Sequence, residues 1–274
     1  MIRPHVIRPH APTSASFARR AIAVLVALAA STLIALGPAP AAHAGDRPLV
    51  VLDPGHGGSY PGAVNCDVRF AGRTCMRESD VNLDVALRTA HLLRRRGYGV
   101  VMTRHTDSDV NPGTDIATHN QKHDGSYIFR KDGVFDIKDE LQARVNVANC
   151  GTIAACPPGS DMQADAFLSI HQNACTCKAG GTTTFDYRDT KLAQDVEHQV
   201  LRRTGLHNRG VEKADFYVIK WTRMPAALAE TAFLSNDHEA RLLKKVAFRR
   251  KIAKGIAAGV AEFLGPPPTN PSPP

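Results

Sequence analysis

The chain has 274 residues and a formal charge of +8, from 34 Lys and Arg against 26 Asp and Glu. Four arginines lie in the first 44 residues, which contain no acid, so the rest of the chain carries only +4. This mild balance excludes the usual signature of nucleic-acid binding, although it suits approach to an anionic surface polymer. The remaining length is enough for one α/β domain with a sizeable core.

The N-terminal segment is typical of a signal peptide. Arg19 and Arg20 precede an apolar run over 21–36, and the sequence Ala-His-Ala at 42–44 suits cleavage, so residues 1–44 are predicted to be removed. The apolar run of 16 residues is shorter than the ~20 that a spanning helix needs, which argues against a stable membrane anchor. The arginine pair is compatible with either the general or the twin-arginine export route.

The mature chain opens with a strand that leads into a loop around a histidine. Residues 50–52 are β-branched or apolar, Pro54 ends the strand, and three glycines let the backbone turn tightly around His56. A helix follows, with Ser79 or Asp80 as its N-cap and a glycine at its end, and residues 98–103 favour a second strand. This order predicts a right-handed crossover between parallel strands.

The remaining segments continue the alternation of strands and helices. Residues 107–139 are interpreted as an inserted loop that borders the cleft, and residues 266–274 as a disordered, proline-rich tail. Between them we expect, in order, a helix over 140–149, strands over 166–171 and 182–187, a helix over 191–205, strands over 216–219 and 226–229, and a helical region from a capping box at Asn236 and Glu239 to about Leu264. The fold class is therefore α/β: a single domain over 45–265, with a mostly parallel, twisted sheet of about six strands flanked by helices.

Three predicted strands end in a side chain that can bind a metal or transfer a proton, namely His56, His171 and Glu230. Glu78 lies just before the first helix, on the same edge of the predicted sheet. Functional groups gather outside the carboxyl ends of parallel strands, so these four residues can meet although they are far apart in sequence. Each alone has an ordinary structural explanation, such as a capping acid or a buried histidine, but jointly they indicate a site.

Two imidazoles and one carboxylate form a suitable ligand set for Zn²⁺, which keeps a fourth position for water. Bound zinc lowers the pKa of that water toward ~7 and polarises a substrate carbonyl. A second carboxylate that does not bind the metal is then needed to carry the proton to the leaving nitrogen. The spacing alone leaves open whether Glu78 or Glu230 is the ligand.

The chain resembles the zinc-dependent N-acetylmuramoyl-L-alanine amidases of the amidase 3 type, bacterial cell-wall hydrolases, in four motif blocks: DPGHGG at 53–58, RESDVNLDVA at 77–86, LSIHQNA at 168–174 and PAALAETAFLSN at 225–236. The resemblance covers nearly all of the mature chain. It implies one zinc ion per chain bound by His56, Glu78 and His171, with Glu230 as the catalytic carboxylate. The chain departs from the usual pattern at Gln172, at Ala232 and in the longer insertion.

The implied substrate is the amide that joins the muramic acid lactyl group to the L-alanine of the stem peptide in peptidoglycan. The implied protein is therefore a secreted autolysin-type amidase of the cell wall, and we expect it to act as a monomer. Two alternatives stay open: a zinc peptidase of different bond specificity, and a catalytically silent wall-binding module. The presence of Glu230 argues against the silent module, which has no need of a proton-transfer carboxylate.

All six cysteines lie in the mature part, and an even number in an exported chain predicts disulfides. Cys66 with Cys75 and Cys150 with Cys156 would close short loops. A bond between Cys175 and Cys177 is disfavoured, because residues so close in sequence seldom reach disulfide geometry without strain. A metal site of His171 with Cys175 and Cys177 is the less favoured alternative in an oxidising environment.

Overall fold

The computed structural model describes residues 47–111, 137–177, 179–188 and 191–268. The predicted signal peptide, most of the predicted insertion and the last six residues of the predicted tail lie outside these ranges. Within them, none of the helices combines the length and the apolar character that a membrane span requires.

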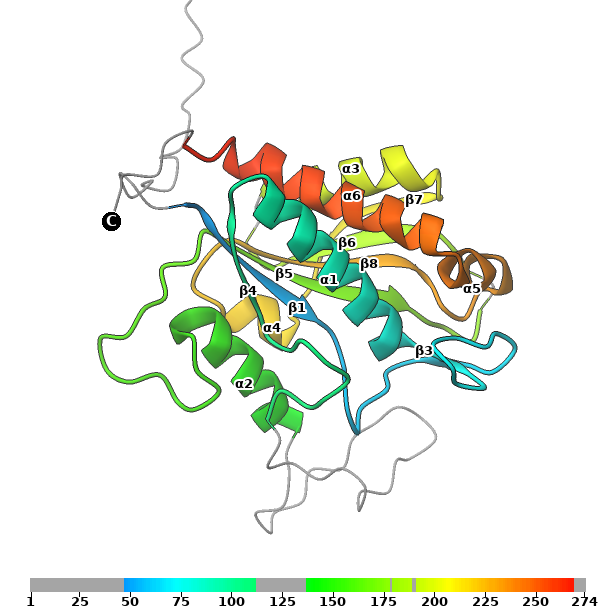
Figure 1. Cartoon of the computed structure of the whole chain (residues 1–274), viewed down its shortest axis with the longest axis horizontal. Coiled ribbons are helices and arrows are strands. Elements are labelled where there is room, and N and C mark those ends of the chain that lie inside the picture. The colour runs from blue at the N-terminus through cyan, green and yellow to red at the C-terminus, as the bar shows by residue number, and fades with distance from the viewer. Residues whose placement is uncertain (1–46, 112–136, 178, 189–190, 269–274) are drawn as a thin grey trace, which may run out of the picture. The chain divides into compact units, whose positions relative to one another are not determined.

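The order of elements is that of an α/β protein (Figure 1). The strands are β1 (Leu49–Pro54), β2 (Val64–Asn65), β3 (Met76–Arg77), β4 (Gly99–Met102), β5 (Ala166–Asn173), β6 (Thr182–Asp186), β7 (Asn208–Lys213) and β8 (Ala226–Phe233). The helices are α1 (Glu78–Arg95), α2 (Ile137–Cys150), α3 (Lys191–Thr204), α4 (Tyr217–Trp221), α5 (Asp237–Lys244) and α6 (Val246–Leu264).

Six strands form one sheet in the order β4-β1-β5-β8-β6-β7, which confirms the predicted mostly parallel sheet. Strand β1 is parallel to both β4 and β5, and β5 is parallel to β8. Strand β6 runs antiparallel to β8 and parallel to β7. The short strands β2 and β3 form a separate antiparallel ribbon just before α1.

Helices cover both faces of the sheet, with α1, α3 and α6 on one side and α2 and α4 on the other (Figure 1). Alternation along the strands directs side chains into both layers: Val50 and Leu52 pack with the first group of helices, and Val51 packs with the second. Because the central strands β1, β5 and β8 are covered on both faces, their apolar runs are nearly continuous.

Several elements differ from the sequence-based expectation, including the β2–β3 ribbon, for which no strands were expected. The predicted strand over 216–219 is instead the start of α4, whose amides at Ile219 and Lys220 donate to the carbonyl of Phe216 while Val218 and Ile219 are buried against the sheet. Strand β7 was not predicted, because it is an exposed edge strand without apolar alternation. The capping box is confirmed in part: Asn236 accepts from the amides of His238 and Glu239 and begins α5.

Candidate functional site

His56 lies in the loop after β1, in a conformation that the surrounding structure enforces. Its φ is +59°, which is uncommon for a residue other than glycine. The preceding Gly55 donates its amide to the carbonyl of Ile170 in β5, so the loop lies against the neighbouring strand. A Cβ on Gly55 would lie 2.1 Å from Nε2 of His171, and therefore only glycine allows this approach.

Glu78 is the first residue of α1 and lies between the two histidines. Its Oε2 is 3.2 Å from Nε2 of His56, and its Oε1 is 2.9 Å from Nδ1 of His171. Its oxygens also accept from the amides of Ala63 and Gln172. Burial alone would raise the pKa of this carboxyl, but the two histidines outweigh burial and hold the pKa well below its usual value.

Helix α1 begins two or three residues earlier than predicted, at Glu78 rather than after a cap at Ser79 or Asp80. Its N-cap is Arg77, whose side chain forms no capping hydrogen bond. The amides of Glu78 and Ser79 donate instead to the carbonyls of Ala63 and Pro61 in the preceding loop. These contacts replace a capping side chain and leave the Glu78 carboxylate for the histidines.

His171 and Glu230 are register partners on the adjacent strands β5 and β8. Both were expected at strand ends, but β5 continues to Asn173 and β8 to Phe233. The ladder between these strands shifts register between His171 and Asn173. The four predicted site residues are nevertheless together, because His56, Glu78 and His171 form one cluster and Glu230 lines the same pocket as both histidines.

The pocket has a volume of about 400 Å³ and opens between α2, α4 and the loop after β1. Glu230 lines it, and the buried Oε2 of Glu230 has no hydrogen-bond partner among the described residues. Burial, aided by the Glu78 carboxylate and opposed by His171, raises the pKa of Glu230 to about 8. Glu230 is therefore a carboxyl group that can gain or lose a proton near neutral pH.

The cluster has the ligand atoms of a metal site. One ligand atom from each of His56, Glu78 and His171 lies within 4.8 Å of the others. A Cβ on Gly62 would lie 2.5 Å from Oε2 of Glu78, so the loop passes over the cluster without filling it. Two imidazoles and a carboxylate are the donor set of three-ligand zinc sites, and these residues therefore fit a bound zinc ion. Among the described residues this is the one group with metal-binding spacing.

Two buried arginines that belong to none of the four motif blocks hold the His56 loop. Arg144 of α2 donates to the carbonyls of Pro54 and His56, and it pairs with Asp53 at 2.6 Å and with Glu140 at 2.8 Å. Arg104 donates to the carbonyls of Pro54 and Gly55. Asp53 also accepts from the hydroxyls of Thr103 and Ser169. No local sequence signal marks either arginine, because the carbonyls that they hold belong to a loop far away in the sequence.

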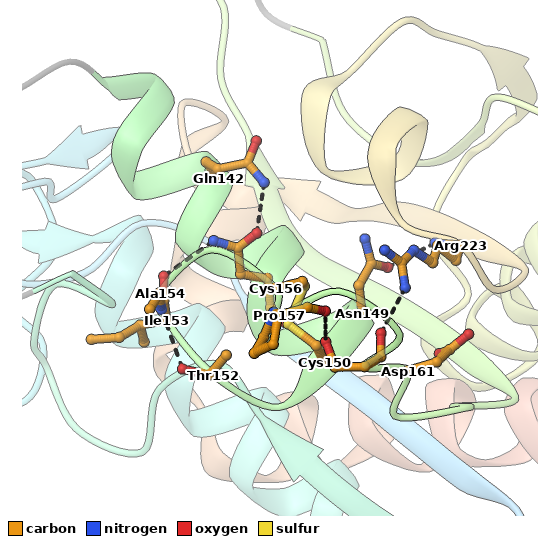
Figure 2. The surroundings of a disulfide bond; sticks show 12 residues. Gln142, Asn149, Cys150, Thr152, Ile153, Ala154, Cys156, Pro157, Asp161 and Arg223 are labelled. Carbon is orange, nitrogen blue, oxygen red and sulfur yellow. Dashed lines mark hydrogen bonds between the residues drawn. A yellow bond between two sulfur atoms is a disulfide. The ribbon is translucent and has the colours of Figure 1, made fainter.

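The structure joins all six cysteines in disulfides, Cys66–Cys75, Cys150–Cys156 and Cys175–Cys177. The third pair, which the short spacing disfavoured, is therefore bonded, and the alternative metal site with His171 loses its two thiolates. The second disulfide closes the turn after α2 and lies next to Asn149 (Figure 2). The side-chain oxygen of Asn149 accepts from the amide of Arg223, which precedes β8.

An α/β domain that gathers two histidines and a glutamate beside a second, unpaired glutamate has the features of the metal-dependent hydrolase class. The family model "N-acetylmuramoyl-L-alanine amidase" (Amidase_3) matches residues 50–262, and the chain belongs to this family.

Curated relatives and solved structures agree with this assignment. The chain is 31% identical to the amidase AmiC of Neisseria meningitidis, and the match covers 80% of this chain and 53% of that protein. It is also 31% identical to the amidase AmiA of Escherichia coli, and this match covers 82% of this chain and 78% of that protein. It thus spans about half the length of the first of these relatives. Among structures, the catalytic domain of CwlV from Bacillus (Paenibacillus) polymyxa matches with 27% identity and a TM-score of 0.58, covering 80% of this chain and 99% of that one. The amidase CwlD from Clostridioides difficile matches with 26% identity and a TM-score of 0.61, covering 80% and 98%.

Proposed function

We propose that the chain is an exported, zinc-dependent peptidoglycan amidase that hydrolyses the amide between N-acetylmuramic acid and the L-alanine of the stem peptide. The observation that carries this proposal is the convergence of His56, Glu78 and His171 beside the unpaired carboxyl of Glu230 in one pocket. Membership of an amidase family gives the bond type. Zinc, one ion per chain, is the proposed cofactor.

In this proposal His56, Glu78 and His171 hold the ion, which supplies a Lewis acid and an acidified water. The chain's own contribution is to keep the ligand atoms in place before any ion binds. Glu78 spans the two imidazoles, and its depressed pKa keeps it ionised at neutral pH. Arg144 fixes the carbonyl of His56, so the orientation of that ring depends on a residue outside the ligand set.

Glu230 is proposed to take the proton from the attacking water and deliver it to the leaving nitrogen. This role requires a carboxyl group near the metal ligands that is not itself engaged by them. The buried Oε2 of Glu230, which has no hydrogen-bond partner among the described residues, lies in the same pocket as both histidines and supports this role. Glu78 is the proposed ligand because its two oxygens contact both histidines. Glu230 is the proposed proton carrier because its Oε2 has no such contact.

The remaining parts of the proposal concern where the protein acts. We propose that residues 1–44 direct export and are removed, that 45–265 form the catalytic domain, and that the mature monomer acts in the cell wall, with peptidoglycan as its partner. The mature net charge of +4 suits an anionic wall. Removal of the apolar run with the signal peptide would leave the mature protein without a membrane anchor.

Digestion of purified peptidoglycan followed by mass analysis of the products tests the proposal. An amidase releases stem peptides that begin with a free L-alanine amino group and leaves the glycan strands intact. Shortened peptides would indicate the alternative peptidase, and absence of products from the zinc-loaded protein would indicate the wall-binding module. Metal analysis of the purified mature chain is the companion measurement, and full activity in a zinc-free preparation would overturn the metal mechanism.

A further inference from the structure

Three exposed aromatic side chains lie on α4 and on the segments next to it. Trp221 is 55% exposed, Phe216 42% and Tyr187 40%, and these are the exposed aromatics among the large hydrophobic residues of the described chain. Lys220 joins two of them, because its Nζ lies 5.6 Å from the centre of the Tyr187 ring and 5.5 Å from that of Trp221. We call Tyr187, Phe216 and Trp221 the aromatic surface. Exposed apolar groups gathered in this way commonly mark a binding site.

The aromatic surface is continuous with the pocket that holds the candidate site. Phe216 and the neighbouring Tyr217 line that pocket together with His171 and Glu230. The ring of Tyr217 is 6.2 Å from that of Trp221, one helical turn further along α4. A ligand that extends out of the pocket along α4 would therefore pass from Phe216 and Tyr217 to Trp221.

Helix α4, which carries Trp221, is anchored to α2 by hydrogen bonds. The hydroxyl of Tyr217 donates to Oε1 of Gln142 in α2 at 2.5 Å. Asn149, also in α2, donates to the carbonyl of Trp221 at 3.0 Å and accepts from the amide of Arg223 at 2.8 Å. Figure 2 shows Asn149 beside the disulfide that closes the end of α2. A backbone that is already anchored loses little conformational entropy when a ligand arrives.

The charges near the aromatic surface favour a neutral ligand. Lys220 is paired with Asp215, with Nζ 2.9 Å from Oδ1. Arg188 donates to the carbonyl of Lys220 and lies over the ring of Tyr187. These cations are thus engaged in holding the surface together. Lys220 lies over the Trp221 ring, but this side chain is still 55% exposed. The negative quadrupole of an exposed ring face attracts the C–H groups of a flat, uncharged partner.

We propose that the aromatic surface is a subsite for sugar rings of the peptidoglycan glycan strand, with Trp221 as its main stacking residue. Pyranose rings present a face of C–H groups, and N-acetylglucosamine is uncharged, whereas stem peptides carry carboxylates that call for unpaired cations. This inference rests on the proposed function. It adds that the glycan leaves the pocket along α4, and that residues of α4 set the preference for long glycan strands over single muropeptides.

Trp221 is the single tryptophan of the chain, so its fluorescence reports directly on this surface. The zinc-loaded mature protein is titrated with a soluble tetramer of β-1,4-linked N-acetylglucosamine and, separately, with a free stem tripeptide. The proposal requires a saturable blue shift of the emission with the tetramer. A shift with the tripeptide alone, a shift that depends only on protein concentration, or none at all would each overturn it.

Substitution of Trp221 gives a second, independent measurement. We expect Trp221→Ala to weaken binding to insoluble peptidoglycan by roughly three- to tenfold, the contribution of one stacking ring. Its KM should rise for long glycan substrates while turnover of a single muramyl peptide is unchanged. Leu87→Ala, at an exposed residue of α1 outside the pocket lining, is the matched control and should bind as the wild type does.

The two arms separate this inference from the proposed amidase function. Tetramer binding requires no hydrolysis, so it can be observed even if the bond specificity differs from the proposal. If the wild type releases stem peptides, and Trp221→Ala binds long peptidoglycan strands and releases their stem peptides as well as the wild type does, the amidase stands and the sugar subsite is wrong. If neither protein releases stem peptides while the tetramer still shifts the emission, the amidase proposal fails and sugar binding stands.

Discussion

Glu230 lies directly opposite His171 in the ladder between β5 and β8, and the buried Oε2 of Glu230 has no hydrogen-bond partner among the described residues. A carboxyl in this position is close to the cluster without belonging to it. We expect Glu230→Gln to keep one bound zinc ion and to lose at least ~100-fold in turnover, since proton transfer is removed while the ligands remain. Metal analysis and peptide release measure the two effects. Loss of the metal would show that Glu230 is a ligand instead.

A methyl group added at Gly55 should prevent metal binding. The added Cβ would lie 2.1 Å from Nε2 and 2.2 Å from Cε1 of His171, so the imidazole must leave its position. Gly72→Ala is the control: it forces an alanine into a φ of +78°, at a cost of roughly 1–2 kcal/mol, but the new Cβ has no heavy atom within 4 Å. Zinc affinity by competition with a chelating dye should fall only for Gly55→Ala. Equal affinities would mean that His171 is not a ligand.

Arg144→Met should destabilise the fold and weaken zinc binding together. The substitution leaves Asp53 and Glu140 without their buried cation and frees the carbonyl of His56, and breaking a buried ion pair costs about 3–5 kcal/mol. Arg88→Met, which removes a partly exposed pair with Asp84, should cost no more than ~1 kcal/mol. Urea unfolding of the metal-free proteins measures these costs.

Arg144→Lys separates the positioning role from general destabilisation. Lysine keeps the charge but cannot reproduce the forked contacts of the guanidinium with Asp53 and His56. If the lysine variant folded stably and bound zinc as tightly as the wild type, the loop around His56 would not depend on Arg144.

Glu197 of α3 should make stability fall as pH rises. Its oxygens accept from the hydroxyls of Thr182 and Thr184, and burial, partly opposed by these hydrogen bonds, raises the pKa of its carboxyl above the usual 4.5. The folded state therefore keeps the proton to a higher pH than the unfolded state does. The contribution of protonated Glu197 to stability is complete below pH 4.5, the usual pKa, and is lost as pH rises through the pKa in the folded state.

Glu197→Gln removes this titration. The wild type should lose stability between pH 5 and pH 8 through Glu197, and the variant should not. The unfolding free energy of the variant minus that of the wild type should therefore increase from pH 5 to pH 8, as measured by urea unfolding at both values. Other titrating groups cancel in this difference. A difference that is constant with pH would contradict the raised pKa.

The sequence predicted the central strands well, because apolar runs such as 50–52 and 166–170 are buried on both faces and can be little else. Strand β7 is an exposed edge without such a run, and α4 is a five-residue helix that apolar and aromatic composition cannot distinguish from a strand. Strand β7 is the edge strand furthest from β4, whereas α4 lines the pocket that contains His171 and Glu230.

Some residues of the candidate site could likewise be identified from the sequence, and others could not. His56, Glu78, His171 and Glu230 could be identified because their motif blocks are short and local. Arg104 and Arg144 could not, because an arginine that holds loop carbonyls from a distant element is indistinguishable in sequence from a solvated one. Their partners exist only in the assembled sheet.

Strand β8 lies between β5 and β6, both of which precede it in the chain. Without residues 226–233 the sheet would separate into β4-β1-β5 on one side and β6-β7 on the other, and Glu230 is part of this joining strand. A chain that ends before β8 therefore lacks both the proposed catalytic carboxyl and an intact sheet. We therefore expect hydrolytic activity to require that β8 has paired with both β5 and β6, whatever the state of the rest of the chain.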